Sequence, residues 1–170
     1  PEIIPAVSTT IYSELPTCTT MKPNGFTDCF VRRPAQGTVD QLRWNGKTSW
    51  TVKNIGGKLG SPPTCRSFLG TGNSAREVIK CFGVTYKGGP AQSKFGKLVY
   101  SKSEDGGNSW GMWYGTDGMW PKKREVFYHH DGPGCEILPM QPFPGSVSNF
   151  EVHCFAYLRL LNPHPAIARK

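Results

Sequence analysis

Six cysteines occur in three similar pairs, and this repetition constrains the fold more than any other feature of the chain. The first cysteine of each pair lies in a Pro-x-Cys motif and the second in a Cys-Phe motif. The motifs occupy residues 16–18 and 29–30, 63–65 and 81–82, and 133–135 and 154–155. There is no Cys-x-x-Cys motif, and the four histidines do not flank the cysteines at zinc-finger spacing. Disulfides are therefore favoured, which places the protein in an oxidising compartment and most simply outside the cell.

The segments between paired cysteines are typical of hairpins. Residues that favour strands lie beside the cysteines, and Gly- or Pro-rich residues such as 22–25 lie in the middle. Facing strands bring opposed residues to a separation that suits a disulfide. Of the fifteen possible connectivities, we expect the following three pairs. They are Cys18–Cys29, Cys65–Cys81 and Cys135–Cys154.

A second hairpin follows the first Cys-Phe motif and another follows the second. Residues 39–44 and 49–52 flank an Asn-Gly turn at 45–48, while 97–100 and 111–114 flank a longer turn. Each full unit thus has four short strands, as in one β-propeller blade. The step of 47 residues from Cys18 to Cys65 also fits a blade of roughly 40–50 residues.

We therefore expect one all-β domain of β-propeller-like repeats, in which three diverged four-stranded blades are each stapled by a disulfide. The repeats span about 16–61, 62–132 and 133–170, and residues 1–15 are a candidate for the missing outer strand of the last. The second contains an insertion of about one hairpin, near residues 113–130. Because ordinary propellers have about 4–8 blades, three alternatives stay open: two chains that complete a six-bladed ring, a fragment of a longer chain, or a compact sandwich.

Two resemblances support this interpretation. The sequence Ser103-x-Asp105-x-Gly107-x-Ser109-Trp110 resembles the Asp-box of sialidase-type propellers, which implies that Asp and Ser side chains brace a turn above the Trp. Residues 39–65 resemble the blade repeat of the fucose- and galactose-binding propeller lectins of insect-pathogenic bacteria. That likeness implies sugar pockets lined by Trp and polar residues.

The candidate ligand-binding residues are aromatic rings, on which the C–H face of a sugar stacks, and guanidinium groups that donate to hydroxyl or carboxylate oxygens. They are Trp44, Tyr100, Trp113, Tyr114, Trp120, Arg32, Arg43 and Arg66. Trp50 and Trp110 adjoin turns and are expected in packing instead. The pair His129-His130 beside Asp131 invites a metal or proton-transfer role, but neighbours in a strand point to opposite faces.

The net charge of +8 favours polyanionic partners, and no apolar run is long enough to cross a bilayer. No cofactor motif and no converging catalytic set is found. The aromatic candidates and the resemblance to propeller lectins imply glycans as the first predicted partner of a secreted, lectin-like protein, and a homodimer would raise its avidity. The alternatives are a cationic hydrolase or nuclease-like effector that uses Arg124, Glu125 and His129, and a non-enzymatic polyanion-binding or structural protein.

Overall fold

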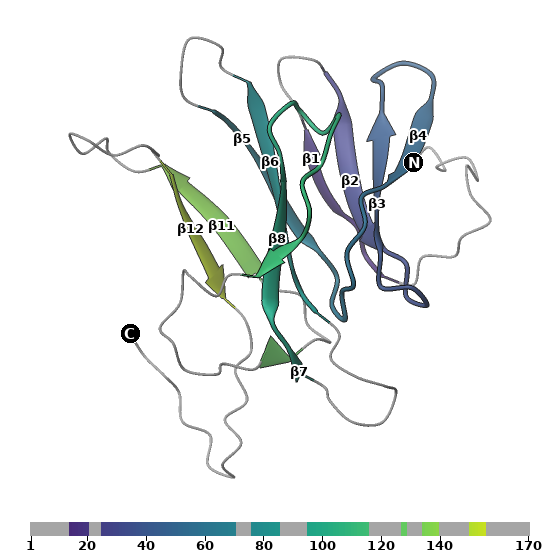
Figure 1. The fold of residues 1–170 in the computed structure, drawn as a ribbon. Helices are drawn as coiled ribbons and strands as arrows, with labels where there is room; N and C mark the ends of the chain where they lie inside the picture. Colours follow the sequence, from purple (N-terminus) through teal and green to yellow (C-terminus); the bar gives the residue numbers. More distant parts are fainter. Residues whose placement is uncertain are drawn as a thin grey trace.

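The structure, a computed structural model, describes residues 14–20, 25–70, 76–85, 95–115, 127–128, 134–139 and 150–155 (Figure 1). These residues form an all-β protein whose main elements are two four-stranded antiparallel sheets. The first sheet contains β1 (Thr17–Thr20), β2 (Thr27–Arg32), β3 (Val39–Trp44) and β4 (Trp50–Asn54) in that order. The second contains β5 (Thr64–Leu69), β6 (Glu77–Val84), β8 (Leu98–Ser103) and β9 (Tyr114–Gly115). Two further pairs are β11 (Gly134–Pro139) with β12 (Phe150–Phe155), and β7 (Phe95–Gly96) with β10 (Phe127–Tyr128).

Local sequence explains the turn that joins β3 to β4. The side-chain oxygen of Asn45 accepts hydrogen bonds from the backbone N–H groups of residues 47, 48 and 49 at 2.9, 2.9 and 3.2 Å. Gly46 takes a positive φ of 78°, which a residue without Cβ adopts at little cost. The turn brings Trp44 opposite Trp50, with ring centroids 5.5 Å apart. This second hairpin therefore forms where the Asn-Gly signal predicts it.

The cysteine hairpins share one register. Cys18 lies opposite Cys29 and Cys65 opposite Cys81, and both pairs are disulfide-bonded, as predicted. Cys135 is likewise the backbone partner of Cys154, although the side chains of β11 and β12 lie outside the described part of the chain. The residue before each first cysteine also faces the Phe after each second one. These three pairs are Thr17 with Phe30, Thr64 with Phe82, and Gly134 with Phe155.

The two sheets pack through unlike faces. Strand residues alternate between faces, so Cys29 and Phe30 lie on opposite sides of the first sheet. Phe30 belongs to the main core cluster together with the buried disulfide Cys65–Cys81 of the second sheet, whereas Cys29 belongs to a separate cluster. The disulfide-bearing face of the second sheet thus covers the disulfide-free face of the first. Equivalent faces do not meet, as they would across a twofold axis.

The linker between β4 and β5 anchors this packing through Leu59, which is 1% exposed. Its backbone N–H donates to the carbonyl of Gly37 at 2.7 Å, and Leu59 also bridges to Thr85 beyond β6. A Cβ at Gly83 would lie 2.5 Å from a methyl carbon of Leu59, so this glycine makes room for the side chain. One leucine therefore joins the two sheets and fixes the path of the linker.

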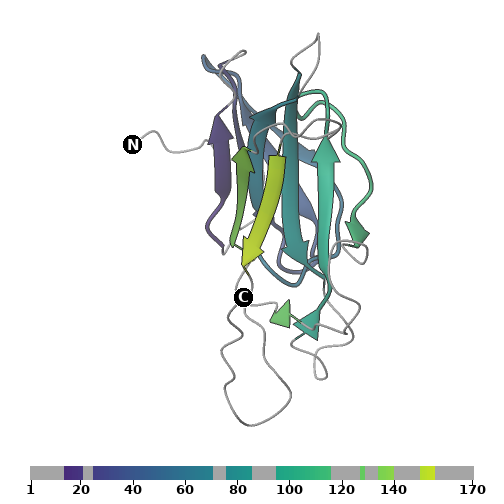
Figure 2. The ribbon, with the colours of Figure 1, turned by 90° about the vertical axis from the view of Figure 1, so that its left-hand side faces the viewer.

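The first strands of the units lie together. β1 contacts β5, and β5 contacts β11 on its other side (Figures 1 and 2). Both sheets are open, and the third unit is described only as the pair β11–β12, so three four-stranded blades in a ring stay a prediction. From the predicted insertion, β10 pairs with β7. Among the residues described here, none belongs to a helix that is long and apolar enough to cross a membrane.

We predict that the buried disulfide Cys65–Cys81 contributes more to stability than the disulfide Cys18–Cys29. Replacing Cys65 and Cys81 together by Ala should lower the free energy of unfolding by about 3 kcal/mol or more, because a loop of sequence separation 16 is released and a packed core site is emptied. The matched variant Cys18→Ala/Cys29→Ala should lose less, because Cys18 is exposed. Urea unfolding of both variants measures the difference, and an equal or reversed order would contradict the prediction.

Candidate functional site

A pocket of about 550 Å³ opens where the β4–β5 linker meets the turn between β8 and β9. Its walls are Ile55, Gly56, Gly57, Lys58, Thr85, Val99, Trp110, Gly111, Met112 and Trp113. The size is in the range of small-molecule sites. Ile55 and Val99 are buried at its base, whereas Lys58 and Met112 are exposed. The pocket therefore combines an apolar floor, two indoles and a cationic side chain.

Trp113 is held by the linker rather than by its own sheet. Its indole nitrogen donates to the carbonyl oxygen of Ile55 at 3.1 Å, and the ring packs against the main core. Gly57 approaches so closely that a Cβ there would lie 3.2 Å from the indole atoms Cε2 and Nε1. Gly56 and Gly57 both have positive φ values, which turns the linker around the ring. The aromatic wall of the pocket thus depends on residues 55–57.

The second indole, Trp110, follows a braced turn at residues 103–109. Asp105 Oδ1 accepts from the Ser103 hydroxyl and from the Ser109 N–H, both at 2.8 Å, and Asp105 Oδ2 accepts from the Ser109 hydroxyl at 2.6 Å. The Gly107 N–H donates to Ser103 Oγ at 2.7 Å. Burial alone would raise the pKa of Asp105, but the bonds from Ser109, Ser103 and Asn108 outweigh it and lower the pKa to about 2. The turn therefore holds an ionised carboxylate at its centre.

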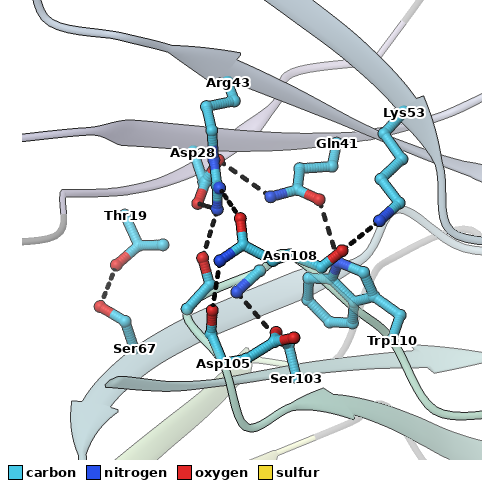
Figure 3. A network of polar contacts seen from close by, with 12 residues as sticks. Thr19, Asp28, Gln41, Arg43, Lys53, Ser67, Ser103, Asp105, Asn108 and Trp110 are labelled. Carbon is cyan, nitrogen blue, oxygen red and sulfur yellow. Dashed lines mark hydrogen bonds and ion pairs between the residues drawn. The ribbon is translucent and has the colours of Figure 1, made fainter. Parts of the chain in front are cut away.

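A chain of polar contacts fastens this turn to the first sheet (Figure 3). Trp110 Nε1 donates to Gln41 Oε1 at 2.9 Å, and Gln41 Nε2 donates to the fully buried Asp28 at 3.0 Å. Arg43 binds Asp28 through two parallel bonds of 2.8 and 2.7 Å. The same guanidinium donates to the Gly106 carbonyl and, at 2.9 Å, to the Asn108 side chain. Arg43 is therefore a clamp between the sheets.

Glu77 lies at the other side of the same turn, where its carbonyl accepts from the Gly106 N–H at 2.9 Å. Its side chain is 9% exposed, and Ser67 hydrogen-bonds to it. Within the described ranges, its Oε2 atom has no hydrogen-bond partner. Burial is the largest cause that raises the pKa of Glu77, and the nearby Asp28 charge acts in the same direction. Protonation of Glu77 is thus easier than for an exposed carboxyl.

The predicted ligand residues do not gather at one place. Trp113 alone among them lines the pocket. Trp44 packs on Trp50 within the first sheet, and Tyr100 and Tyr114 lie opposite each other in the second. Trp120 lies outside the described residues, as do Arg124, Glu125, His129 and His130.

The three predicted arginines are engaged with the protein itself. Arg32 donates to both carboxylate oxygens of Glu14 at 3.1 Å and to the Leu59 carbonyl at 3.2 Å. Arg66 donates to the carbonyl of Cys65 at 3.2 Å. Arg43 is the inter-sheet clamp, and its bond to Asp28 raises the pKa of the guanidinium. These contacts place the three guanidinium groups apart from the pocket walls.

Sequence reasoning missed the linker side of the pocket. A sequence signal exists for Gly56, Gly57 and Lys58, because they belong to the stretch 39–65 on which a resemblance was argued, but only the folded chain brings them to Trp113. Nothing in the sequence around Thr85 indicates that this residue lines the pocket. In the part of the chain that the structure describes, no group of three His, Cys, Asp or Glu side chains could hold a metal ion.

Comparison of the chain with models of protein families, with curated proteins and with solved structures finds no match.

We predict that Arg43→Met lowers the free energy of unfolding by about 3–5 kcal/mol, because it leaves the buried Asp28 carboxylate without its cation. Lys53→Met is the control: it removes another cation that reaches the same turn, at Asn108, but from an exposed position. It should change stability by less than about 0.5 kcal/mol. The measurement is urea unfolding at pH 7, and similar losses in the two variants would refute the clamp.

We predict that Asp105 makes stability depend on pH below about 4. Its folded pKa lies below its ordinary value of 3.8, so it stabilises the fold above that pH and loses this contribution as the pH falls through about 2. The variant Asp105→Asn should be less stable than the parent at pH 7, and the two stabilities should converge between pH 4 and 2. Glu77 titrates with the opposite sign in both proteins, so it cancels in the difference. A constant difference across this range would contradict the assignment.

Proposed function

We propose that this protein is a secreted, non-enzymatic glycan-binding module whose ligand site is the pocket beside Trp113. The observation that carries the proposal is the pairing of Trp110 and Trp113 with a polar rim in a pocket of about 550 Å³ between the two sheets. The two disulfides support an extracellular setting, because such bonds persist under oxidising conditions.

The walls suit a sugar better than a purely apolar ligand. An indole offers a flat apolar surface to the C–H face of a pyranose ring, while sugar hydroxyls need directed hydrogen bonds. Lys58 supplies an ammonium donor, and the Thr85 hydroxyl, which already accepts from the Lys97 N–H at 2.9 Å, still has its own hydrogen to donate. Among the described residues that line the pocket, none is Asp, Glu, His or Cys. This lining favours binding over catalysis.

We also infer that the units are arranged as blades around an axis near their first strands. Three observations support this arrangement: the shared hairpin register, the packing of unlike faces, and the contacts of β5 with both β1 and β11. Repeated units that pack through unlike faces build a ring or an open stack, because each unit leaves a free face for the next. Units that pack through like faces form a closed twofold pair. Two chains would then complete a ring of six blades. The glycan pocket would lie between neighbouring blades.

The test is binding of the whole chain to a glycan array at physiological salt, followed by calorimetric titration of the best sugar. Trp113→Leu should weaken that binding at least about tenfold, which corresponds to about 1.4 kcal/mol. Trp44→Leu is the matched control, because this half-buried indole stacks within the first sheet. Lys58→Ala is a second pocket variant that leaves the core intact, because Lys58 is exposed. It should weaken binding to a smaller extent.

Thermal unfolding of each variant separates lost binding from lost structure. Saturable binding that depends on Trp113 and Lys58 but not on Trp44 supports the site. Absence of binding to every sugar overturns the proposed function, and dependence on Trp44 alone moves the site elsewhere. Hydrolysis of a bound glycan or of RNA by the pure protein would overturn the non-enzymatic function and support a cationic hydrolase or nuclease-like effector instead. The mass of the protein in solution tests the dimer.

A further inference from the structure

The second sheet has a row of three cations on the face turned away from the first sheet. Arg66 on β5 is the direct cross-strand partner of Lys80 on β6, and Lys80 is the partner of Lys102 on β8. These three residues, the basic row, alternate with Cys65, Cys81 and Ser101, which are fully buried on the side that faces the first sheet. Like charges placed directly opposite each other on a sheet are unfavourable. An anion that bridged Lys80 and Lys102 would therefore reduce the repulsion between these two cross-strand partners.

An aromatic row runs beside the basic row on the same face. Phe82, Tyr100 and Tyr114 are successive cross-strand partners, with ring centroids 6.2 and 6.1 Å apart. Tyr114 is 46% exposed at the edge of the sheet, and the Lys102 side chain is 44% exposed one row away. The β8–β9 end of the two rows is therefore open, whereas β11 contacts the sheet at the β5 end.

Among the described neighbours of Lys80 and Lys102, one carboxylate, that of Glu104, forms an ion pair with one of the two lysines. Glu104 binds Lys102 at 2.5 Å, and the Lys80 ammonium lies 5.5 Å from the ring centre of Phe68. Burial is the main cause that lowers the pKa of Lys80, the Lys102 charge lowers it further, and the Glu104 charge acts in the opposite direction. An anion bound between the two ammonium groups would relieve this repulsion.

The equivalent row of the first sheet is neutral and closed. In the shared register, Thr19, Asp28 and Arg43 occupy the places of Arg66, Lys80 and Lys102. There Asp28 and Arg43 form the buried ion pair that clamps the two sheets, and Thr19 bonds with Ser67. The second unit has replaced the acid by Lys80 and has kept a cation at residue 102. The same backbone position thus serves packing in one unit and presents positive charge in the other.

We propose that Lys80 and Lys102 of the basic row and the two tyrosines beside them bind an acidic glycan, with sulfate or carboxylate groups on the two lysines and a sugar ring on Tyr114. The two lysines and the net charge of +8 favour an anionic ligand. The exposed ring of Tyr114 favours a ligand whose anionic groups are attached to a sugar, because a sugar ring can stack on it. The disulfides favour an extracellular glycan over an intracellular nucleic acid. This site is independent of the pocket beside Trp113.

The test measures the affinity of the whole chain for a heparin-derived octasaccharide by calorimetry at 150 mM salt. Lys80→Gln/Lys102→Gln should weaken binding by roughly tenfold or more and make it less sensitive to salt, because two ionic contacts are lost. The matched control, Lys47→Gln/Lys53→Gln, removes the same charge from exposed lysines of the first sheet. It should change affinity less than about twofold. Tyr114→Ala should also weaken binding, and Tyr114→Phe should retain it.

Other outcomes decide against the proposal. Equal losses in the two lysine variants would show that net charge alone attracts the octasaccharide. Tighter binding of a single-stranded oligonucleotide of equal charge would assign the surface to nucleic acid, and no binding of the octasaccharide would refute the site. If Lys80→Gln/Lys102→Gln lowers the melting temperature and leaves affinity unchanged, the row has a structural role. Binding of the pocket sugar by the same variant keeps this test separate from that of the proposed function.

Discussion

The contact between unlike faces of the two sheets is the constraint on which the other features depend. Because the disulfide-bearing face of the second sheet covers the disulfide-free face of the first, Phe30 meets the Cys65–Cys81 bond and Trp110 meets Phe30 edge-on, with ring centroids 5.4 Å apart. Apolar burial supplies the driving force for this contact. The Asp28–Arg43 pair fixes the orientation of the two sheets, since the charges of a buried ion pair are satisfied in only one relative arrangement.

This packing also decides what each face can do. The turn that carries Trp110 is pressed against the first sheet, so its indole is shared between packing and the pocket wall. Trp113 then reaches the β4–β5 linker, where the close approach of Gly57 leaves room for the ring. On the far side of the second sheet the charge at this position is reversed, because Lys80 stands where Asp28 stands in the first sheet. The same position in the repeat therefore carries the acid of a buried ion pair in the first sheet and a cation in the second.

Much of the local structure could be predicted from the sequence. The Pro-x-Cys and Cys-Phe motifs predicted two disulfides that the structure contains, and the Asn45-Gly46 signal predicted the β3–β4 hairpin. These features are local, since a turn residue or a hairpin register acts over a few neighbouring residues. The ligand residues were harder to assign. Arg43 has the same side chain whether it donates to a sugar or to Asp28, and only the partner across 15 positions of sequence distinguishes the two.

The sequence by itself determined an all-β chain of repeated, disulfide-linked hairpins, because alternation, turn residues and cysteine spacing are properties of short segments. The tertiary structure alone decided which faces meet, and thereby which aromatic residues line a pocket and which cations stay outside. Lys58, Thr85 and Trp113 are far apart in the chain and become neighbours through sheet packing. That packing depends on the complementarity of whole surfaces, which no single segment encodes.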